Sequence, residues 1–269
     1  GVEKIFGIPG GAILPLYGTL SEYPELDHIL VRHEQGASHA ADGFSRVSGK
    51  TGVCFATSGP GATNLITGMA TAMMDSSPMI AITGQVSRPG IGKDSFQEID
   101  ITGASLPVTK HNYLVMNAHE IPRILKEAFI IANTGRPGPV LIDIPRDVFM
   151  EEFDFDNNFW NEEIKILGYN PPKYADNSKI DSALKLIEQS KRPVILAGHG
   201  IIISRAYDEL LELAENAQIP VVTTLLGISS FPENHVLSLS FPGMHGVAWA
   251  SLALDQADLV IAIGSRFDD

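Results

Sequence analysis

The chain has 269 residues, of which 44% are hydrophobic and 19% charged, as expected for a soluble globular protein with about two domains. Its formal net charge of −13 argues against a nucleic-acid-binding surface, although it leaves room for local basic sites for phosphates. The single cysteine, Cys54, excludes an internal disulfide, and no apolar run approaches the roughly 18 to 20 residues that span a bilayer. These features predict a protein of a reducing, cytoplasmic-type compartment that binds neither nucleic acid nor membrane.

Residues 1–150 alternate between strand-like and helix-like patterns. Apolar, strand-like runs cover 4–8, 26–31, 52–57, 78–83 and 140–144, and helical spacing covers 13–20, 34–47, 62–74 and 121–133. A long polar loop, 84–109, follows the fourth strand. Because strands and helices alternate and the strands are apolar throughout, the pattern predicts a parallel sheet with helices on both faces.

An acidic segment that contains Asn and Pro, 151–177, has the composition of a linker. After it a second alternation begins, with helices at 178–189, 204–217 and 247–254 and strands at 193–197, 220–223 and 259–263. The prediction is therefore an α/β protein of two three-layer, parallel-sheet domains, 1–150 and 178–269, the second of them truncated. The chain starts without Met and stops just after an apolar strand, so we expect it to be a fragment of a longer protein.

Glu34 stands where a predicted strand ends and a predicted helix begins. In open α/β sheets, ligands bind in the crevice beyond the carboxyl ends of the strands, which makes this carboxylate a candidate functional group. A glutamate at a helix start is more often a favourable charge at the positive end of the helix dipole, and on this stretch alone that interpretation is preferred. The neighbouring His33 is interpreted as a packing residue, and Arg136 and Arg146, which bracket the last strand of the first domain, as surface residues.

Three loops of the first domain carry residue types suited to ligand binding. Two glycines follow the first strand in 8–12, and the glycine-rich turn 57–64 opens a helix, although it lacks the Gly-Lys-Ser/Thr ending of a Walker A loop. The loop 84–109 is longer than most connections, and its Phe96 and Gln97 suit a small-molecule pocket. In isolation, the two glycine turns are equally well explained by chain geometry.

Glycine-bearing loops also occur in the second domain, at 198–201, 241–246 and 264–269. The first holds only half of a dinucleotide-binding fingerprint, but three such loops in one domain favour a dinucleotide site over coincidence. His199 and His245 lack the spacing of metal ligands, so no metal site is predicted within these residues.

Taken together, in order and spacing, these motifs resemble the large, catalytic subunits of acetolactate synthase (acetohydroxyacid synthase), a thiamine-diphosphate-dependent family. The resemblance covers essentially the whole chain and rests on the segments 6–12, 32–37, 57–64, 83–86, 94–98, 135–140, 243–246 and 264–269. It implies that 1–150 is the thiamine-diphosphate pyrimidine-binding domain and 178–269 a truncated central FAD-binding domain. The family's Gly-Asp-Gly…Asn motif for Mg²⁺ and diphosphate does not occur in this sequence, so the fragment alone is expected to be inactive.

The resemblance implies a proton-relay role for Glu34. In the family the matching glutamate hydrogen-bonds N1′ of the cofactor's aminopyrimidine ring and favours the imino tautomer, whose 4′-nitrogen removes the C2 proton of the thiazolium ring. Position by position, Gly11 and Gln97 join Glu34 as catalytic residues, and Phe96 and Arg146 match substrate positions, although many members have Lys in place of Arg146. Thiamine diphosphate would be held by Glu34, Pro9, Gly10, Pro60 and Asn64. FAD would be held by Arg136, Gly198, Gly200, Thr224, Met244, His245, Gly264, Ser265 and Arg266.

The implied reaction is the decarboxylation of pyruvate and transfer of the two-carbon unit to a second 2-keto acid, pyruvate or 2-ketobutyrate. The products would be 2-acetolactate or 2-aceto-2-hydroxybutyrate, for valine, leucine and isoleucine biosynthesis. The sequence Arg-Phe-Asp-Asp at 266–269 favours the FAD-containing branch, in which the flavin does no net redox chemistry and the enzyme is a transferase. The resemblance also implies a homodimer or tetramer with the active site at the interface, a regulatory small subunit and a bacterial-type cytoplasmic location.

Three alternatives stay open at this point. The first is a related thiamine-diphosphate enzyme, such as a pyruvate oxidase or a glyoxylate carboligase, although the latter lacks the glutamate that Glu34 supplies. The second is a nucleotide-binding oxidoreductase with the second domain as a Rossmann unit, against which the incomplete Gly-x-Gly spacing and the unexplained first domain count. The third is a non-catalytic fragment whose function is assembly only.

Overall fold

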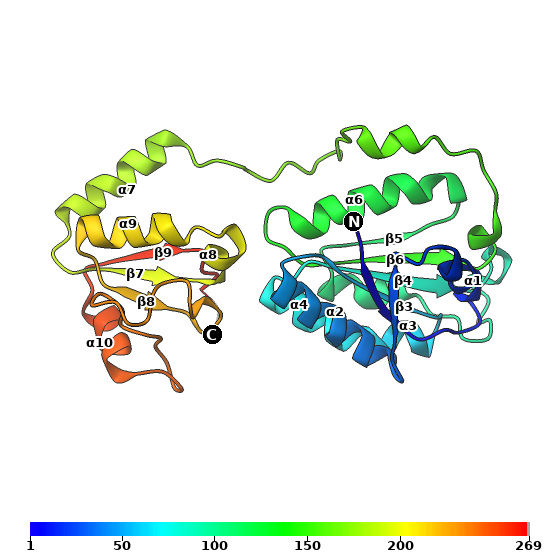
Figure 1. Cartoon of the computed structure of the whole chain (residues 1–269), viewed down its shortest axis with the longest axis horizontal. Helices are drawn as coiled ribbons and strands as arrows, with labels where there is room; N and C mark the ends of the chain where they lie inside the picture. The colour runs from blue at the N-terminus through cyan, green and yellow to red at the C-terminus, as the bar shows by residue number, and fades with distance from the viewer. Residues whose placement is uncertain (268–269) are drawn as a thin grey trace. The chain divides into compact units, whose positions relative to one another are not determined.

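The computed structural model describes residues 1–267, which fold into two compact units, unit 1 at Gly1–Lys173 and unit 2 beginning at Tyr174 (Figure 1). Each unit has its own sheet and its own hydrophobic cores. Asp268 and Asp269, the last two residues of the Arg-Phe-Asp-Asp motif, lie outside the described residues. No helix within 1–267 is both long enough and apolar enough to cross a membrane.

Unit 1 is built on a parallel sheet. Over the described residues, its six strands are β1 (Lys4–Gly7), β2 (Asp27–Leu30), β3 (Gly52–Ala56), β4 (Met79–Gln85), β5 (His111–Leu114) and β6 (Pro139–Pro145). Their order across the sheet is β2-β1-β3-β4-β6-β5, and every neighbouring pair is parallel. The connecting helices are α1 (Leu14–Thr19), α2 (Glu34–Ser48), α3 (Pro60–Asn64), α4 (Ile66–Asp75), α5 (Ile101–Ser105) and α6 (Ile121–Asn133).

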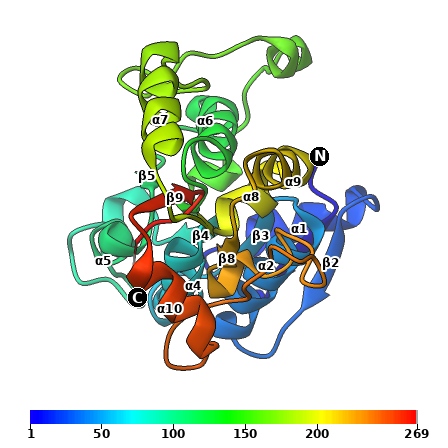
Figure 2. The same cartoon turned by 90° about the vertical axis from the view of Figure 1, so that its left-hand side faces the viewer.

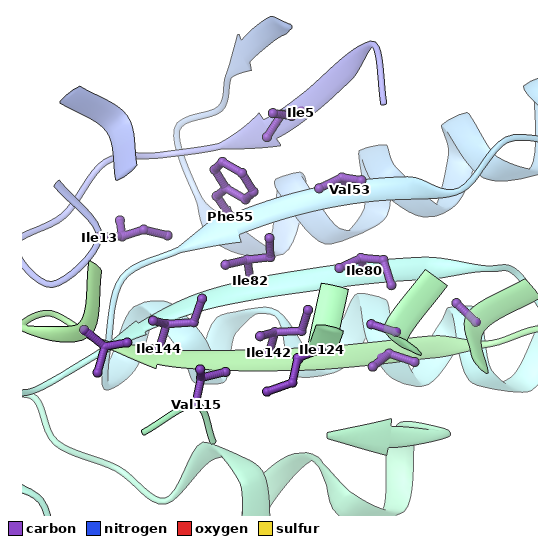
Figure 3. Packing of buried hydrophobic residues seen from close by; sticks show 14 of the residues in the cluster. Ile5, Ile13, Val53, Phe55, Ile80, Ile82, Val115, Ile124, Ile142 and Ile144 are labelled. Carbon is purple, nitrogen blue, oxygen red and sulfur yellow. The ribbon is translucent and has the colours of Figure 1, made fainter. Parts of the chain in front are cut away.

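Helices cover both faces of this sheet, because successive side chains of a strand point to opposite sides. One face carries Ile80 of β4 and Ile142 of β6, which pack with Ile124 of α6 in the cluster drawn in Figure 3. The other face carries Ala81 and Leu141, which share a core with residues of α2 and α4. The strands are therefore buried on both sides, which explains their continuous apolar runs.

Unit 2 repeats the arrangement on a smaller scale. Its strands are β7 (Pro193–Ala197), β8 (Val221–Thr223) and β9 (Leu259–Ile263), which pair in parallel in the order β8-β7-β9. Its helices are α7 (Asn177–Gln189), α8 (His199–Ser204), α9 (Tyr207–Ala217) and α10 (Ala248–Gln256). Residues of α7, α8 and α9 pack on one face of the sheet and those of α10 on the other (Figure 2). The predicted fold class, α/β with two three-layer parallel-sheet domains, is confirmed.

Some predicted elements differ from the observed ones. The helix predicted at 62–74 is two helices, α3 and α4, because the backbone N–H of the buried Leu65 bonds to Ala62 three residues back. The long loop predicted at 84–109 contains α5, and the edge strand β5 after it was not predicted because its residues are only partly buried. In unit 2, Arg205 adopts a left-handed conformation (φ 58°) that ends the unpredicted α8, so α9 begins at Tyr207 rather than at 204.

Residues 151–173, most of the segment with linker composition, pack with unit 1. Phe153 lies against the core drawn in Figure 3. The Lys126 ammonium donates to the carbonyl of Phe159 at 2.9 Å, and the Tyr169 hydroxyl donates to the carbonyl of Thr134 at 2.9 Å. The assignment of the two domains to different cofactors stays a prediction.

Candidate active site

Apart from Arg136, which precedes β6, the predicted site residues of unit 1 follow the carboxyl ends of its strands. Glu34 is the first residue of α2, and three residues separate it from the end of β2. His33 caps this helix: its backbone is extended, and its Nδ1 accepts a hydrogen bond from the N–H of Gln35 at 3.1 Å. A side-chain acceptor at this position satisfies one of the unpaired N–H groups at a helix start. His33, interpreted from sequence as a packing residue, therefore fixes the first turn of α2 and the backbone of Glu34.

The Glu34 carboxylate is half-buried and held through one oxygen. Asn64 Nδ2, at the end of α3, donates to Glu34 Oε2 at 3.0 Å. The other oxygen, Oε1, faces Gly61, where an added Cβ would lie 3.2 Å from it and 2.8 Å from Thr57 Cγ2. Within residues 1–267, Oε1 has no hydrogen-bond donor, so it can accept one from a bound ring N–H.

The turn after β1 lies against the end of β3. The N–H of Ala12 donates to Thr57 Oγ1 at 3.2 Å, and a Cβ on Gly10 would come within 2.5 Å of Thr57 Cβ. Close packing therefore requires glycine at Gly10. At Gly11, by contrast, an added Cβ meets no atom within 4 Å, so packing inside this chain does not explain that glycine.

The loop that carries Phe96 and Gln97 touches the turn beside Glu34. Gly59 has φ +60°, and a Cβ there would lie 2.5 Å from the carbonyl oxygen of Gln97. Gln97 also has positive φ (+57°), and Phe96 is 87% exposed, unusual for so large an apolar side chain. The structure thus brings Gln97 to the Gly59–Gly61 turn on which Glu34 packs.

The Glu98 carboxylate shapes the tip of this loop. It accepts hydrogen bonds from the N–H groups of Gly92, Lys93 and Ser95, the last at 2.8 Å. The bonds from Gly92 and Ser95 lower the pKa of Glu98 below its usual value, because they stabilise the charged form.

A buried polar cluster that sequence reasoning missed lies at the ends of β4 and β6. Asp143 is 1% exposed; its Oδ1 accepts from Thr83 Oγ1 at 2.6 Å and its Oδ2 from Gln85 Nε2 at 2.9 Å. Burial raises the pKa of Asp143 to about 7, against the opposing effect of these two bonds. The available signal was a lone carboxylate inside an apolar strand. The exposed Arg146 comes directly after β6, and its N–H donates to the carbonyl of Gln85 at 3.0 Å.

In unit 2 the loops after three strands meet. Gly200 donates its N–H to the carbonyl of Gly264 at 3.0 Å, and a Cβ on Gly198 would collide with that same carbonyl group. Thr224 follows β8, donates its N–H to the carbonyl of Ala197 at 2.9 Å and accepts at Oγ1 from Gly227. The structure thus places Gly198, Gly200, Thr224, Gly264 and Ser265 at the carboxyl ends of β7, β8 and β9, where such sheets bind ligands.

The remaining predicted FAD residues are more scattered. Met244 is 92% exposed, and His245 and Arg266 are also exposed. Arg136 belongs to unit 1, where its guanidinium donates to the carbonyls of Met73 and Met74 at the end of α4, at 2.6 and 3.1 Å, and to Ser76. These contacts explain Arg136 as a structural residue at a helix C-terminus, and its role toward a flavin stays a prediction.

Comparison with known proteins finds family matches in both units and relatives along the whole chain. Residues 1–104 match the thiamine pyrophosphate enzyme N-terminal TPP-binding domain, and residues 180–269 match the central domain of these enzymes. The chain is 54% identical to the acetolactate synthase large subunit of Corynebacterium glutamicum, over 99% of this chain and 42% of that protein. It is 55% identical to a probable acetolactate synthase large subunit of Methanocaldococcus jannaschii, over the whole chain and 45% of that protein. An acetolactate synthase of Mycobacterium bovis is 52% identical over the whole chain and 43% of its own length.

The chain thus spans less than half the length of these curated relatives. Its two family matches fall on the two structural units, and Glu34, Gly59 and Gln97 lie within the first match. The chain belongs to the thiamine pyrophosphate (thiamine diphosphate) enzyme family, and within it is similar along its whole length to the large subunit of acetolactate synthase.

Proposed function

We propose that this chain is the N-terminal and central part of an acetolactate synthase large subunit. The whole enzyme would decarboxylate pyruvate and transfer the two-carbon unit to pyruvate or 2-ketobutyrate, giving 2-acetolactate or 2-aceto-2-hydroxybutyrate for branched-chain amino-acid biosynthesis. The observation that carries this proposal is the carboxylate of Glu34, fixed at Oε2 by Asn64 and open at Oε1 above Gly61. Identities above 50% to proteins named acetolactate synthase support the choice of reaction.

The residues around Glu34 fit the aminopyrimidine of thiamine diphosphate. Glu34 Oε1 would hold the proton at the ring nitrogen N1′, while Asn64 keeps the carboxylate from rotating. Glycine at Gly61 leaves room beside Oε1, and Gly11, which no internal contact explains, would let the backbone approach the reacting centre. When bound, thiamine diphosphate supplies a thiazolium ring that accepts the electrons released as CO₂ leaves a 2-keto acid.

Substrate contacts are proposed for three residues around this centre. Phe96 offers an exposed aromatic face and Gln97 a neutral hydrogen-bonding group on the same loop. Arg146 would provide a positive charge for a substrate carboxylate, with a planar group in place of the ammonium of Lys. The exposure of Phe96 in this chain supports an active site that is completed at a subunit interface of a homodimer or tetramer.

Two further ligands belong to the proposal. FAD would bind in unit 2 at the glycine loops after β7 and β9 and at Thr224, with Met244, His245 and Arg266 as additional contacts, and it would undergo no net redox change. The position of these loops at the carboxyl ends of β7, β8 and β9 supports a ligand-binding crevice there, because open parallel sheets bind ligands at that edge. Mg²⁺ would be held by residues outside this chain, and a regulatory small subunit is the proposed protein partner.

Replacement of Glu34 by Gln in the full-length protein tests this function. The amide keeps the shape but cannot hold the proton, so exchange of the C2 proton of bound thiamine diphosphate should slow by about 10²- to 10⁴-fold. Proton exchange followed by NMR in D₂O measures this, with Glu25→Gln, an exposed glutamate, as the matched control. Near-normal exchange in Glu34→Gln contradicts the assignment, as does consumption of pyruvate without formation of a new carbon–carbon bond.

A further inference from the structure

The sheet face of unit 1 that packs on α2, α4 and α5 changes from apolar to polar as its strands end. On β4 the buried Met79 and Ala81 are followed on the same side by Thr83 and Gln85, because side chains alternate along a strand. On the neighbouring β6, Asp143 follows Leu141 in the same way, and its Cα pairs in register with that of Thr83. Thr83, Gln85 and Asp143 are 0%, 4% and 1% exposed.

Gln85 connects the buried carboxylate to both ends of the segment 86–99. Its Nε2 donates to Asp143 Oδ2 at 2.9 Å and also to the carbonyl of Ile99 at 2.8 Å. Its Oε1 accepts from the N–H of Val86 at 2.9 Å. One side-chain amide thus bonds to the first and the last residue of the loop that carries Phe96 and Gln97.

Asp143 decides which way this amide faces. If the Gln85 amide turned over, Oε1 would point at the carboxylate and at the Ile99 carbonyl, which are both acceptors, and Nε2 would point at the Val86 N–H. The Thr83 hydroxyl donates to the other carboxylate oxygen, Oδ1, at 2.6 Å, so rotation of the Asp143 carboxylate away from Gln85 would break this hydrogen bond. The neighbouring charged group is Asp100, at the start of α5, whose negative charge also raises the pKa of Asp143.

Burial of the Asp143 carboxylate lowers the stability of the folded protein. A buried carboxylate loses hydration, and apolar residues of similar volume are often more stabilising at such positions. The high pKa of Asp143 reflects that loss. A carboxylate buried at this cost and bonded on both oxygens suits a role in specifying one arrangement of its neighbours, of which Gln85 bonds to both ends of the loop of Phe96 and Gln97.

We propose that Asp143 is a positioning residue which, through the Gln85 amide, holds both ends of the segment 86–99 and so places Phe96 and Gln97. The inference about loop order rests on the hydrogen bonds alone, whereas its consequence for substrate rests on the function proposed above. Asp143 lies on a different strand from the loop it orders, 44 residues further along the chain from Ile99.

Two substitutions of Asp143 in the full-length protein distinguish its hydrogen-bonding role from the simple filling of space. Asp143→Asn keeps the arrangement, because its Oδ1 can accept from Gln85 while its Nδ2 donates to the Thr83 hydroxyl. Asp143→Leu removes both acceptors and leaves Gln85 free to turn. Thr109→Val is the matched control, since Thr109 is also buried and its hydroxyl bonds to the carbonyl of Ser105, outside this network.

The first readout is hydrogen–deuterium exchange of peptides from 86–99, which does not depend on catalysis. Asp143→Leu should exchange these amides on the order of tenfold faster than wild type, in line with the loss of one buried hydrogen bond, and Asp143→Asn and Thr109→Val should not. In steady-state assays, kcat/KM for pyruvate should fall at least about tenfold in Asp143→Leu only. C2 proton exchange of bound thiamine diphosphate should stay within about twofold of wild type, because Glu34 and Asn64 are untouched.

Loop exchange in Asp143→Leu that equals the Thr109→Val control overturns the proposal, and so does Asp143→Asn behaving like Asp143→Leu. If Asp143→Leu does not fold, Gln85→Met provides the same test, because it cuts the connection to Val86 and Ile99 and leaves the bond between Thr83 and Asp143. Failure of the proposed function is distinguishable: the wild-type protein would then form no acetolactate, while the exchange measurement would still decide whether Asp143 orders the loop.

Discussion

At the residue scale, Glu34 differs from an ordinary helix-end carboxylate in its neighbours. A favourable charge at a helix start needs only solvent and the helix dipole. Glu34 instead has one oxygen bonded to Asn64, from a different strand–helix unit, and the other placed over a glycine that leaves space. The opposite outcome holds for Arg136, whose contacts with the end of α4 explain it without any ligand.

The environment of Cys54 predicts the reactivity of its thiol. Its thiol is fully buried, and burial raises its pKa to about 12. At pH 8 the folded protein then holds roughly a thousandfold less thiolate at this position than an exposed cysteine does. Iodoacetamide should therefore leave Cys54 unmodified in the folded protein and alkylate it after unfolding in urea, as measured by peptide mass spectrometry. Ser48→Cys, at an exposed position, serves as the reactive control; rapid alkylation of folded Cys54 would contradict the prediction.

At the scale of elements, the site is assembled from turns that follow neighbouring parallel strands. The turn after β3 contacts the loop after β4 at Gly59 and the start of α2 at Gly61. Because parallel strands end at the same edge of a sheet, short turns are enough to bring these groups together. The turn at Gly59 needs a backbone conformation, φ +60° and ψ −122°, that side chains other than that of glycine rarely adopt.

Gly59→Ala should therefore destabilise the protein and disturb the loop of Gln97. Strain at positive φ is expected to lower the free energy of unfolding by about 1–3 kcal/mol, and the new Cβ would also press against the Gln97 carbonyl. Chemical denaturation and proteolysis of the segment 86–99 measure the two effects. Gly43→Ala is the control, because it lies inside α2 with no atom near its added Cβ and should be neutral or stabilising by up to about 1 kcal/mol. Equal stability of the two variants would show that the turn relaxes freely.

At the scale of the whole molecule, the two units carry different parts of the proposed enzyme. Unit 1 holds Glu34, the carboxylate proposed as the proton relay, and unit 2 holds the glycine loops of the proposed flavin site. The relatives are more than twice as long as this chain, so the proposed enzyme needs sequence beyond these residues.

The full-length protein is accordingly expected to be purified yellow. Its flavin absorbance should persist during turnover with pyruvate under anaerobic conditions, because the flavin undergoes no net redox change in the proposed reaction. Absorbance spectroscopy before and after addition of pyruvate measures this. Gly200→Val, which would push a side chain into the backbone of Gly264, should lower the amount of flavin bound, with Gly43→Ala, inside α2 and clear of other atoms, as the control. An active, colourless enzyme would assign the protein to a flavin-free branch, and bleaching by pyruvate would contradict transferase chemistry.

Much of the fold and part of the site could be predicted from local sequence. Continuous apolar runs between helical patterns predicted two parallel, three-layer units, and the turn glycines marked strand ends. The edge strand β5 was not predicted because its residues are only partly buried. The division between α3 and α4 at Leu65 was not predicted because Leu65 itself continues the helical apolar pattern. The role of Asp143 was not predicted because a carboxylate in an apolar strand does not indicate its hydrogen-bond partners, which lie 58 and 60 residues away.

The amino-acid sequence by itself determined the alternation of elements, the junction at which Glu34 sits and the glycine positions, because each depends on neighbours along the chain. Only the tertiary structure decided that Asn64 holds Glu34, that Gln97 touches Gly59 and that Asp143 reaches the loop through Gln85. These contacts follow from the strand order β2-β1-β3-β4-β6-β5 and its register. Strand order is a long-range choice among packings, which no local pattern of residues specifies.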